Sequence, residues 1–280
     1  MYMNEIGSNK FGNLLVYLFF IVVTLLSVFP FYWMYVVGSN TTSAVNQFPP
    51  AVLPGTNFME NARNVFERID FLGVMMNSLI ISGAVTLSVL FFCSLAGYAF
   101  TKLTFKGRDA AFIFVIATMM IPPQLGLIPN FMLISELGWI DNLRAVIVPA
   151  MVNAFGVFWM RQYISSAMPY ELVEAARVDG CSHFRIYWNI VLPIVKPALA
   201  TLGIFTFMMT WNDFLWPLVV LKDSSVHTIQ IALRTLNDVY STDYSMILAG
   251  TFMATLPILI VFLIFNKQFV SGITEGAVKN

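Results

Sequence analysis

Charge is scarce in this sequence: Lys, Arg, Asp and Glu make up 11% of its 280 residues, against about 25% in an ordinary soluble domain. The 15 basic side chains balance the 15 acidic ones, and apolar residues reach 58%. The balance excludes the basic field that nucleic-acid binding requires. The composition excludes a soluble globular protein and predicts a protein that lies in a lipid bilayer.

Groups for catalysis and metal binding are also scarce. The two cysteines, Cys93 and Cys181, and the two histidines, His183 and His227, are too few for a disulfide framework or a four-ligand metal site. The phosphate-binding pattern G-x-x-x-x-G-K-S/T is absent, and so are H-E-x-x-H and G-x-S-x-G. We therefore expect no metal, no cofactor and no catalysis in this chain.

Long apolar runs are abundant instead. A helix needs about 20 largely apolar residues to cross a bilayer. Six stretches qualify, and they predict an all-α integral membrane protein with a single domain over residues 1–280. The stretches are residues 11–37, 74–101, 109–134, 143–163, 196–221 and 246–269. Pro122, Pro123 and Pro129 must interrupt the regular helix of the third stretch.

The distribution of basic residues predicts the orientation. Six crossings put both termini on one side, and the segments on that side carry ten Lys and Arg against five on the other. Basic residues in short loops favour the cytosol, and residues 102–108 form such a loop. We predict a multi-pass protein of the cytoplasmic (inner) membrane with both termini in the cytosol.

Residues 164–195 form the longest cytosolic segment, and they predict a pair of short helices. Ser165 or Ser166 can cap the first helix, which we place at residues 169–179. Gly180 favours its end in a left-handed conformation. A second helix can start near Ser182 and end before Pro193. A pair this short is marginal in water, so the pattern indicates a partner protein.

This segment resembles the EAA loop in the membrane subunits of ABC importers. The resemblance rests on Glu174-Ala175-Ala176, Gly180, Ile190 and Leu192-Pro193 at the spacing of that loop. Further parts of the chain resemble the carbohydrate-uptake branch of the family, and in particular its second permease subunit. These parts are residues 122–129, 138–139, 161–162, 169, 211–217, 270–272 and 276–279.

The resemblance implies a type I ABC importer fold and a set of partners. These are a second related permease subunit, two cytosolic ATPase subunits that hold ATP and Mg²⁺, and an extracellular or periplasmic substrate-binding protein. It also implies that the helix around Glu174 docks in a cleft of the ATPase. The residues expected to contact the ATPase are Leu172, Glu174, Ala175, Ala176, Asp179 and Gly180. The alternative is that Glu174 is a solvated helix charge.

Asp213 is the acidic residue that lies well inside a predicted span. It precedes Leu221 by eight residues, about 12 Å of helix, and a carboxylate at that depth indicates function. With Asn212 and the flat rings of Trp211 and Trp216 it suits a sugar pathway. Equally, Asp213 could bond to a neighbouring helix or a backbone amide and fix a bend before Pro217.

An outer loop is predicted at residues 222–243, between the last two spans. By resemblance it reaches the substrate-binding protein, with His227, Arg234 and Asp238 as candidate contacts. Arg234 and Asp238 also stand four apart, the spacing of an ion pair within one helix. The sequence is therefore compatible with two interpretations of this loop, a docking surface and an internal ion pair.

Three other functions compete with a sugar permease. An importer for a non-sugar solute would share the same motifs. A secondary transporter would need several ion-coupling groups inside the membrane, where Asp213 stands alone. An integral membrane enzyme is opposed by the missing nucleophile and metal patterns.

Overall fold

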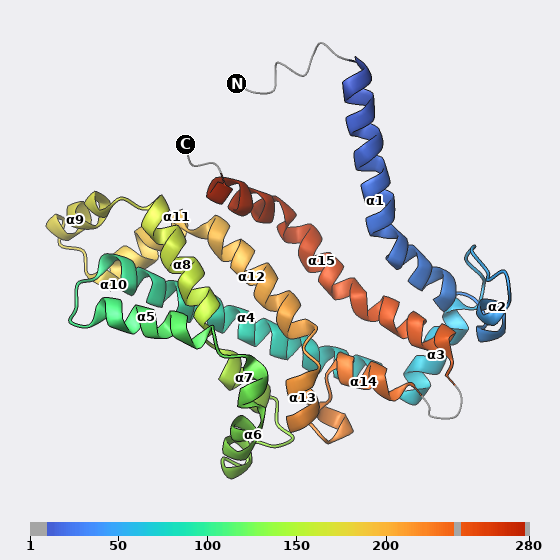
Figure 1. Ribbon diagram of the computed structural model, residues 1–280. Helices are drawn as coiled ribbons and strands as arrows, with labels where there is room; N and C mark the ends of the chain where they lie inside the picture. The colour runs from blue at the N-terminus through green and yellow to red at the C-terminus, as the bar shows by residue number, and fades with distance from the viewer. Residues whose placement is uncertain (1–9, 238–241, 278–280) are drawn as a thin grey trace. The chain divides into compact units, whose positions relative to one another are not determined.

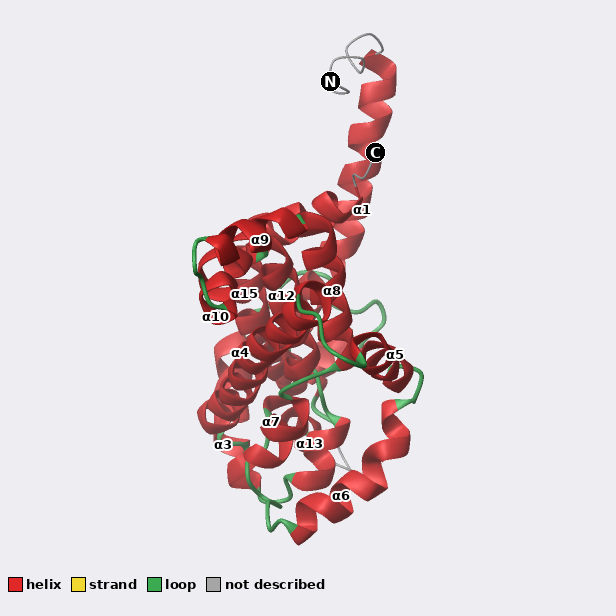
Figure 2. Cartoon of the chain, turned by 90° about the vertical axis from the view of Figure 1, so that its left-hand side faces the viewer, coloured by secondary structure: helices red, strands yellow, loops and turns green. Residues whose placement is uncertain are grey.

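The computed structural model describes residues 10–237 and 242–277, and within these ranges it is helical, without a strand (Figure 2). Three short helices, η3 (Pro123–Gly126), η4 (Tyr187–Val191) and η5 (Ser224–Val226), join the longer ones. The α-helices are α1 (Lys10–Gly38), α2 (Thr42–Asn46), α3 (Phe58–Arg68), α4 (Phe71–Lys102), α5 (Arg108–Thr118), α6 (Leu127–Glu136), α7 (Arg144–Ala150), α8 (Ala154–Ala167), α9 (Tyr170–Val178), α10 (His183–Ile186), α11 (Leu192–Ile194), α12 (Lys196–Trp211), α13 (Leu215–Val220), α14 (Ile229–Thr235) and α15 (Tyr244–Ala277) (Figure 1).

The chain forms two compact units, and the larger one comprises residues 70–234 and the described residues from 256 to 277. Its centre is α4, against which α8 and α12 pack. Gly97 of α4 permits the close crossing with α8, since a Cβ there would lie 2.8 Å from the backbone nitrogen of Arg161. Helices α9 and α10 lie at one end of this unit, and α6 and α13 at the opposite end (Figures 1 and 2).

The smaller unit comprises the described residues up to 69 together with residues 242–255 and the short stretch 235–237. Gly38 at the end of α1 approaches the backbone of Ala249 so closely that a Cβ would lie 2.9 Å from its nitrogen. The ring of Tyr35 packs against those of Phe58 and Phe252, with centroids 5.4 and 5.3 Å apart. This unit thus combines a glycine contact with an aromatic cluster.

By length and composition, the described helices provide four to six candidate membrane spans. Four are long and apolar enough on their own: residues 12–38, 71–102, 144–167 and 244–265. Two further spans are possible if each bent pair of helices counts as one. The six-span prediction agrees with this upper number.

The stretch 109–134 is interrupted at its prolines, as predicted, and its two halves, residues 108–118 and 123–136, meet at 92°. Pro123 begins η3, and Pro129 falls in the first turn of α6, where a helix needs no backbone donor. The second bent pair consists of residues 183–194 and 196–211, which meet at 79°. It differs from the predicted span 196–221, because α12 ends at Trp211 and α13 begins only at Leu215.

The helix pair within residues 164–195 differs from expectation at two ends. Ser165 and Ser166 do not cap α9, because α8 continues to Ala167. The second helix does not stop before Pro193 but continues to Ile194. A π-helical turn precedes the proline, with the Leu192 amide bonded to the Tyr187 carbonyl, and this wider turn accommodates the missing donor.

Candidate functional site

Local signals define both ends of α9. Pro169 is the N-cap, and Glu171 lies in the first turn at the positive end of the helix dipole. Gly180 follows the last turn with φ +76°. The amide of Cys181 then bonds to the Ala176 carbonyl at 2.9 Å, and that of Gly180 to Arg177 at 3.0 Å. These two bonds form a Schellman motif, so the predicted helix at residues 169–179 and its glycine stop are confirmed.

The two faces of α9 differ in exposure. Val173 and Ala176, three residues apart, are buried. Leu172, one of the residues expected to contact the ATPase, is 42% exposed because it lies at the edge of the buried stripe. Glu174 and Ala175 are exposed, as are Asp179 and Gly180 beyond the helix. Ala176 therefore contacts the protein's own core, and Glu174 and Ala175 point outward.

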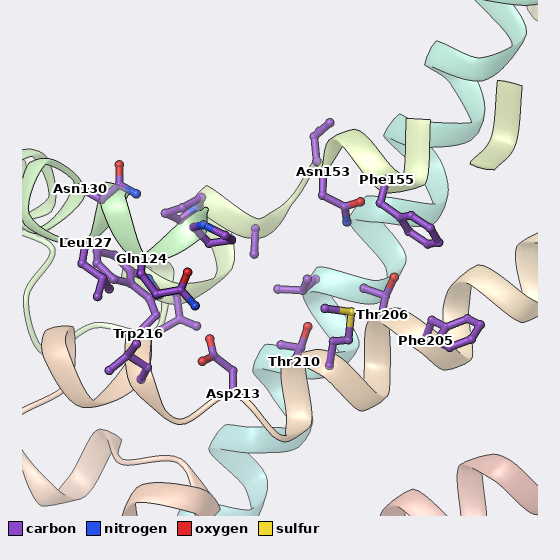
Figure 3. Close-up of a pocket in the computed structure, with 18 residues that line it drawn as sticks. Gln124, Leu127, Asn130, Asn153, Phe155, Phe205, Thr206, Thr210, Asp213 and Trp216 are labelled. Carbon is purple, nitrogen blue, oxygen red and sulfur yellow. The ribbon is translucent and has the colours of Figure 1, made fainter. Parts of the chain in front are cut away.

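A cavity of about 770 Å³ lies in the larger unit. Its lining side chains come from helices far apart in the sequence, and Figure 3 shows Asp213, Gln124 and Trp216 on one side with Thr206 and Asn153 on the other. The lining comprises Val85, Pro123, Gln124, Leu127, Asn130, Val146, Pro149, Ala150, Val152, Asn153, Phe155, Phe205, Thr206, Met209, Thr210, Asp213, Leu215 and Trp216.

The structure brings two of the four predicted pathway residues to this cavity. Asp213 and Trp216 line it, whereas Trp211 is 1% exposed and stacks on Phe207. Asn212 also lies outside the lining, and its side chain donates to the Met208 carbonyl at 2.8 Å. The backbone changes direction where α12 ends, so neighbouring residues there face different sides, and only Asp213 and Trp216 face the cavity.

Asp213 does not lie in a helix, contrary to expectation. It occupies the break between α12 and α13, so a depth based on helical rise does not apply to it. Its carboxylate accepts hydrogen bonds from the backbone of Trp216 and Leu215. The Trp216 indole donates to the Ala145 carbonyl at 3.0 Å. Asp213 thus lines the cavity and fixes the start of α13 through bonds to backbone amides, while its role in a sugar pathway stays a prediction.

Sequence reasoning missed the other polar lining residues. Gln124 and Asn130 follow the proline pair, Asn153 caps α8 by accepting from the Gly156 amide, and Thr206 and Thr210 stand four apart on α12. Uncharged polar residues inside apolar stretches were the available signal. They share the cavity only because the broken helices bring them together.

The predicted outer loop, residues 222–243, is ordered over its described part. Asp141, with φ +56°, accepts hydrogen bonds from the amides of Lys222 and Asp223. Hydrogen bonds from the Ser225 hydroxyl and amide hold the pKa of the Asp223 carboxyl below its ordinary value, and the charge of His227 acts in the same direction. Residues 229–235 form α14.

The three candidate docking residues of this loop differ in position. His227 is half-buried, and its carbonyl accepts from the Asn77 side chain at 3.1 Å. Arg234 is exposed at the end of α14. Asp238 lies outside the described residues, so its pair with Arg234 stays a prediction. Among the residues that the structure describes, no three His, Cys, Asp or Glu side chains form a metal-binding group.

Comparison with known proteins gives one family. Residues 90–270 match the model of the family described as "Binding-protein-dependent transport system inner membrane component". The chain is 35% identical over 270 residues to the arabinooligosaccharides transport system permease protein AraQ of Bacillus subtilis, with 94% of each chain covered. It is 37% identical over 254 residues to the lactose transport system permease protein LacG of Rhizobium radiobacter, covering 91% of this chain and 92% of that one.

Two further similarities extend the comparison. The sn-glycerol-3-phosphate transport system permease protein UgpE of Brucella abortus is 31% identical over 279 residues, with 96% of both chains covered. A solved bacterial ABC transporter involved in the import of the acidic polysaccharide alginate superposes with a TM-score of 0.81 at 23% identity, covering 94% of this chain and 98% of that one. The latter shows that the two chains share a fold, the expected type I permease fold.

Proposed function

Since the chain belongs to the family of binding-protein-dependent transport system inner membrane components, we propose that it is one of two permease subunits of an ATP-driven importer for a sugar or oligosaccharide. The observation that carries this proposal is α9, a capped helix of nine residues whose Glu174 and Ala175 are exposed. Small Ala175 suits close approach to a cleft, and Glu174 suits an ion pair that sets the register. The remaining contacts that we assign to the ATPase are Leu172, Asp179 and Gly180.

The substrate is proposed from the relatives and from the cavity. Two relatives are named for arabinooligosaccharides and lactose. The cavity has the volume of a small-molecule site, about 300–1,000 Å³, and Trp216 offers a flat ring to the carbon face of a sugar. Most of the substrate contacts can still come from the companion permease.

A phosphorylated solute is the second candidate, since one relative is named for sn-glycerol-3-phosphate. The described lining of the cavity includes no Lys, Arg or His, and its one ionisable side chain is the carboxyl of Asp213. A lining without cations offers a phosphate no compensating charge. We therefore favour a neutral sugar.

The proposed importer has three kinds of partner. A second related permease completes the pathway, two cytosolic ATPase subunits bind ATP and Mg²⁺ and perform hydrolysis, and an external binding protein delivers the sugar to the outer loop. This chain itself needs no cofactor. His227, Arg234 and Asp238 are the contacts that we propose for the binding protein.

Reconstitution tests this function. The permease pair with its ATPase, placed in proteoliposomes, should take up labelled sugar only when ATP is inside and the copurifying binding protein is outside. The ligand carried by that protein identifies the substrate. Uptake by the permeases alone, driven by an ion gradient, would instead establish a secondary transporter. A phosphorylated ligand in the binding protein would contradict the neutral-sugar proposal.

Cysteine labelling tests the proposed orientation, with both termini in the cytosol of a cytoplasmic-membrane protein. After Cys93 and Cys181 are replaced, a single cysteine at the exposed position 106 should resist an impermeant thiol reagent in intact cells. One at the exposed position 225 should react. Permeabilised cells provide the control, since both positions then react. Labelling of position 106 from outside would reverse the assigned sidedness.

A further inference from the structure

Helix α4 is one uninterrupted rod of 32 residues, about 48 Å long at 1.5 Å per residue. Among the candidate spans in the described part of the chain, it alone contains no proline. It is also packed along its length by α8 and α12. Such a helix resists bending and compression better than the broken pairs around it.

The inner end of α4 is hydrogen-bonded to three points of the coupling segment, residues 168–194. Ser94, Tyr98 and Lys102 stand four apart and therefore on one face. The Ser94 hydroxyl lies 2.7 Å from that of Tyr187, and the Tyr98 hydroxyl 3.3 Å from Nδ1 of His183.

The third contact reaches Met168, the C-cap of α8, which precedes the N-cap of α9. The ammonium of Lys102 donates to the carbonyl of Met168 and lies 5.9 Å from the centroid of the Tyr170 ring. Ser94, Tyr98 and Lys102 are 0, 2 and 6% exposed. Because so little water reaches these three side chains, each is left unsatisfied when its partner is lost. The contacts therefore fix the coupling segment to α4.

The outer end of α4 is bonded to the outer loop in the same way. The Asn77 amide donates to the carbonyls of Ser225 and His227 at 3.0 and 3.1 Å. The buried Ser78 hydroxyl accepts from the Ile229 amide at 2.8 Å, at the start of α14. These contacts are to backbone groups, so they position the loop itself and not one side chain.

We propose that α4 is the element that transmits displacement between the outer loop and the coupling segment, with Asn77 and Ser78 as positioning residues at one end and Ser94, Tyr98 and Lys102 at the other. The two sets are separated by up to 25 residues of continuous helix, about 38 Å. Coupling over this distance requires a connected and rigid element, and α4 has direct bonds at both ends. The inference rests on the proposed function for its biological meaning.

Hydrogen exchange of the assembled importer in nanodiscs tests the transmission. The double variant Asn77→Ala/Ser78→Ala breaks only the outer contacts, yet amides of residues 170–186 should exchange about fivefold faster, the lower range of typical couplings. Conversely, Lys102→Met should speed exchange in residues 224–235. Lys102→Arg keeps a donor for the Met168 carbonyl and should restore the wild-type rate.

Two controls make the result specific. Ser88→Ala removes a hydroxyl bonded within α4 itself, to the Ala84 carbonyl, and should change exchange at neither end. If Lys102→Met does not fold, Tyr98→Phe removes the single bond to His183 and takes its place. Faster exchange confined to the mutated end would overturn the proposal.

ATP hydrolysis in the same samples separates this inference from the proposed function. Wild-type importer that is not stimulated by its binding protein would contradict the function, whereas the exchange result would still decide the role of α4. Stimulated wild type with normally stimulated Asn77→Ala/Ser78→Ala would contradict the inference alone.

Discussion

Helix α4 and the pair α12–α13 cross the same unit in opposite ways. The first runs from Phe71 to Lys102 without a break, and its polar side chains bond to segments at both ends. The second breaks after Trp211, and the break places Asp213 and Trp216 on a cavity. Continuous backbone is therefore used where positions must be held, and interrupted backbone where polar groups must face a space within the bundle.

The difference depends on where proline falls. Pro217 occupies the first turn of α13, and Pro129 that of α6, positions at which a helix has no use for a backbone donor. Each proline thus lies in the first turn of its helix, where it removes no backbone hydrogen bond. Helix α4 contains no proline, so its backbone hydrogen bonds are uninterrupted and all of them resist bending.

The largest effect should follow from a change at the α4–α8 crossing. Gly97→Leu would drive a side chain into α8, because its Cβ would lie 2.8 Å from both the backbone nitrogen of Arg161 and the Cβ of Met160. Overpacking costs about 1–3 kcal/mol or more, so we expect loss of the assembled subunit in detergent size-exclusion profiles.

Gly83 provides the matched control on the same helix. A Cβ at Gly83 meets nothing within 4 Å, and Gly→Ala in a helix gains about 0.5–1 kcal/mol. Gly83→Ala should therefore retain or raise the melting temperature. Equal damage from both changes would show that α4 does not depend on this crossing.

The next effect concerns α9, which the inner end of α4 holds. Glu174→Lys reverses the charge of its exposed face, and Gly180→Leu forces a side chain into the left-handed region, at about 1–2 kcal/mol. Both should abolish uptake while membrane levels stay normal. Glu174→Gln is the milder comparison and should retain part of the activity. Normal sugar-stimulated ATP hydrolysis in the charge-reversed variant would rule out docking through this face.

A smaller effect is expected at the break itself. Asp213→Asn removes the charge but keeps an acceptor for the backbone of Trp216 and Leu215, so assembly with the partner permease should survive. Uptake should fall by about tenfold, the result of 1.4 kcal/mol. Failure to assemble would mean that the residue serves folding, and a normal uptake rate would remove it from the pathway.

The smallest effect is a pH dependence of the outer loop. The pKa of Asp223 is lower in the folded protein than its ordinary value, mainly through hydrogen bonds from Ser225. The stabilisation is therefore present above the unfolded pKa and is lost as pH falls below about 4 through the folded pKa. Between pH 7 and pH 3 the wild type should lose slightly more thermal stability than Asp223→Asn. An equal loss in both proteins would contradict the assignment.

Features encoded by adjacent residues were predictable from the sequence. The ends of α9 follow from Pro169 and Gly180, and the long helices α1, α4 and α15 from their apolar length. A bend before Pro217 was one of the two interpretations of Asp213, but the end of α12 at Trp211 was not predicted, because the run from residue 196 to 221 is apolar over most of its length. That Pro217 would fall in the first turn of a new helix was not predicted either.

The candidate site was only partly predictable for the same reason. Asp213 and Trp216 were identified by chemistry and they line the cavity, but neighbouring Trp211 and Asn212 do not. Which side of a chain faces a cavity depends on the residue at which a helix ends. The contacts of Lys102 with Met168 likewise join residues far apart in sequence, and no local pattern indicates them.

The composition of the cavity lining has a consequence for protein engineering. Helix α4 contributes one side chain to it, that of Val85, and the rest come from other elements. A combinatorial library at Gln124, Asn130, Thr206 and Thr210 would therefore vary the proposed solute contacts while leaving both bonded ends of α4 intact. Variants with altered solute preference should keep the coupling between the outer loop and the coupling segment that we propose for α4. Selection for growth on a new carbon source can therefore act on the cavity alone.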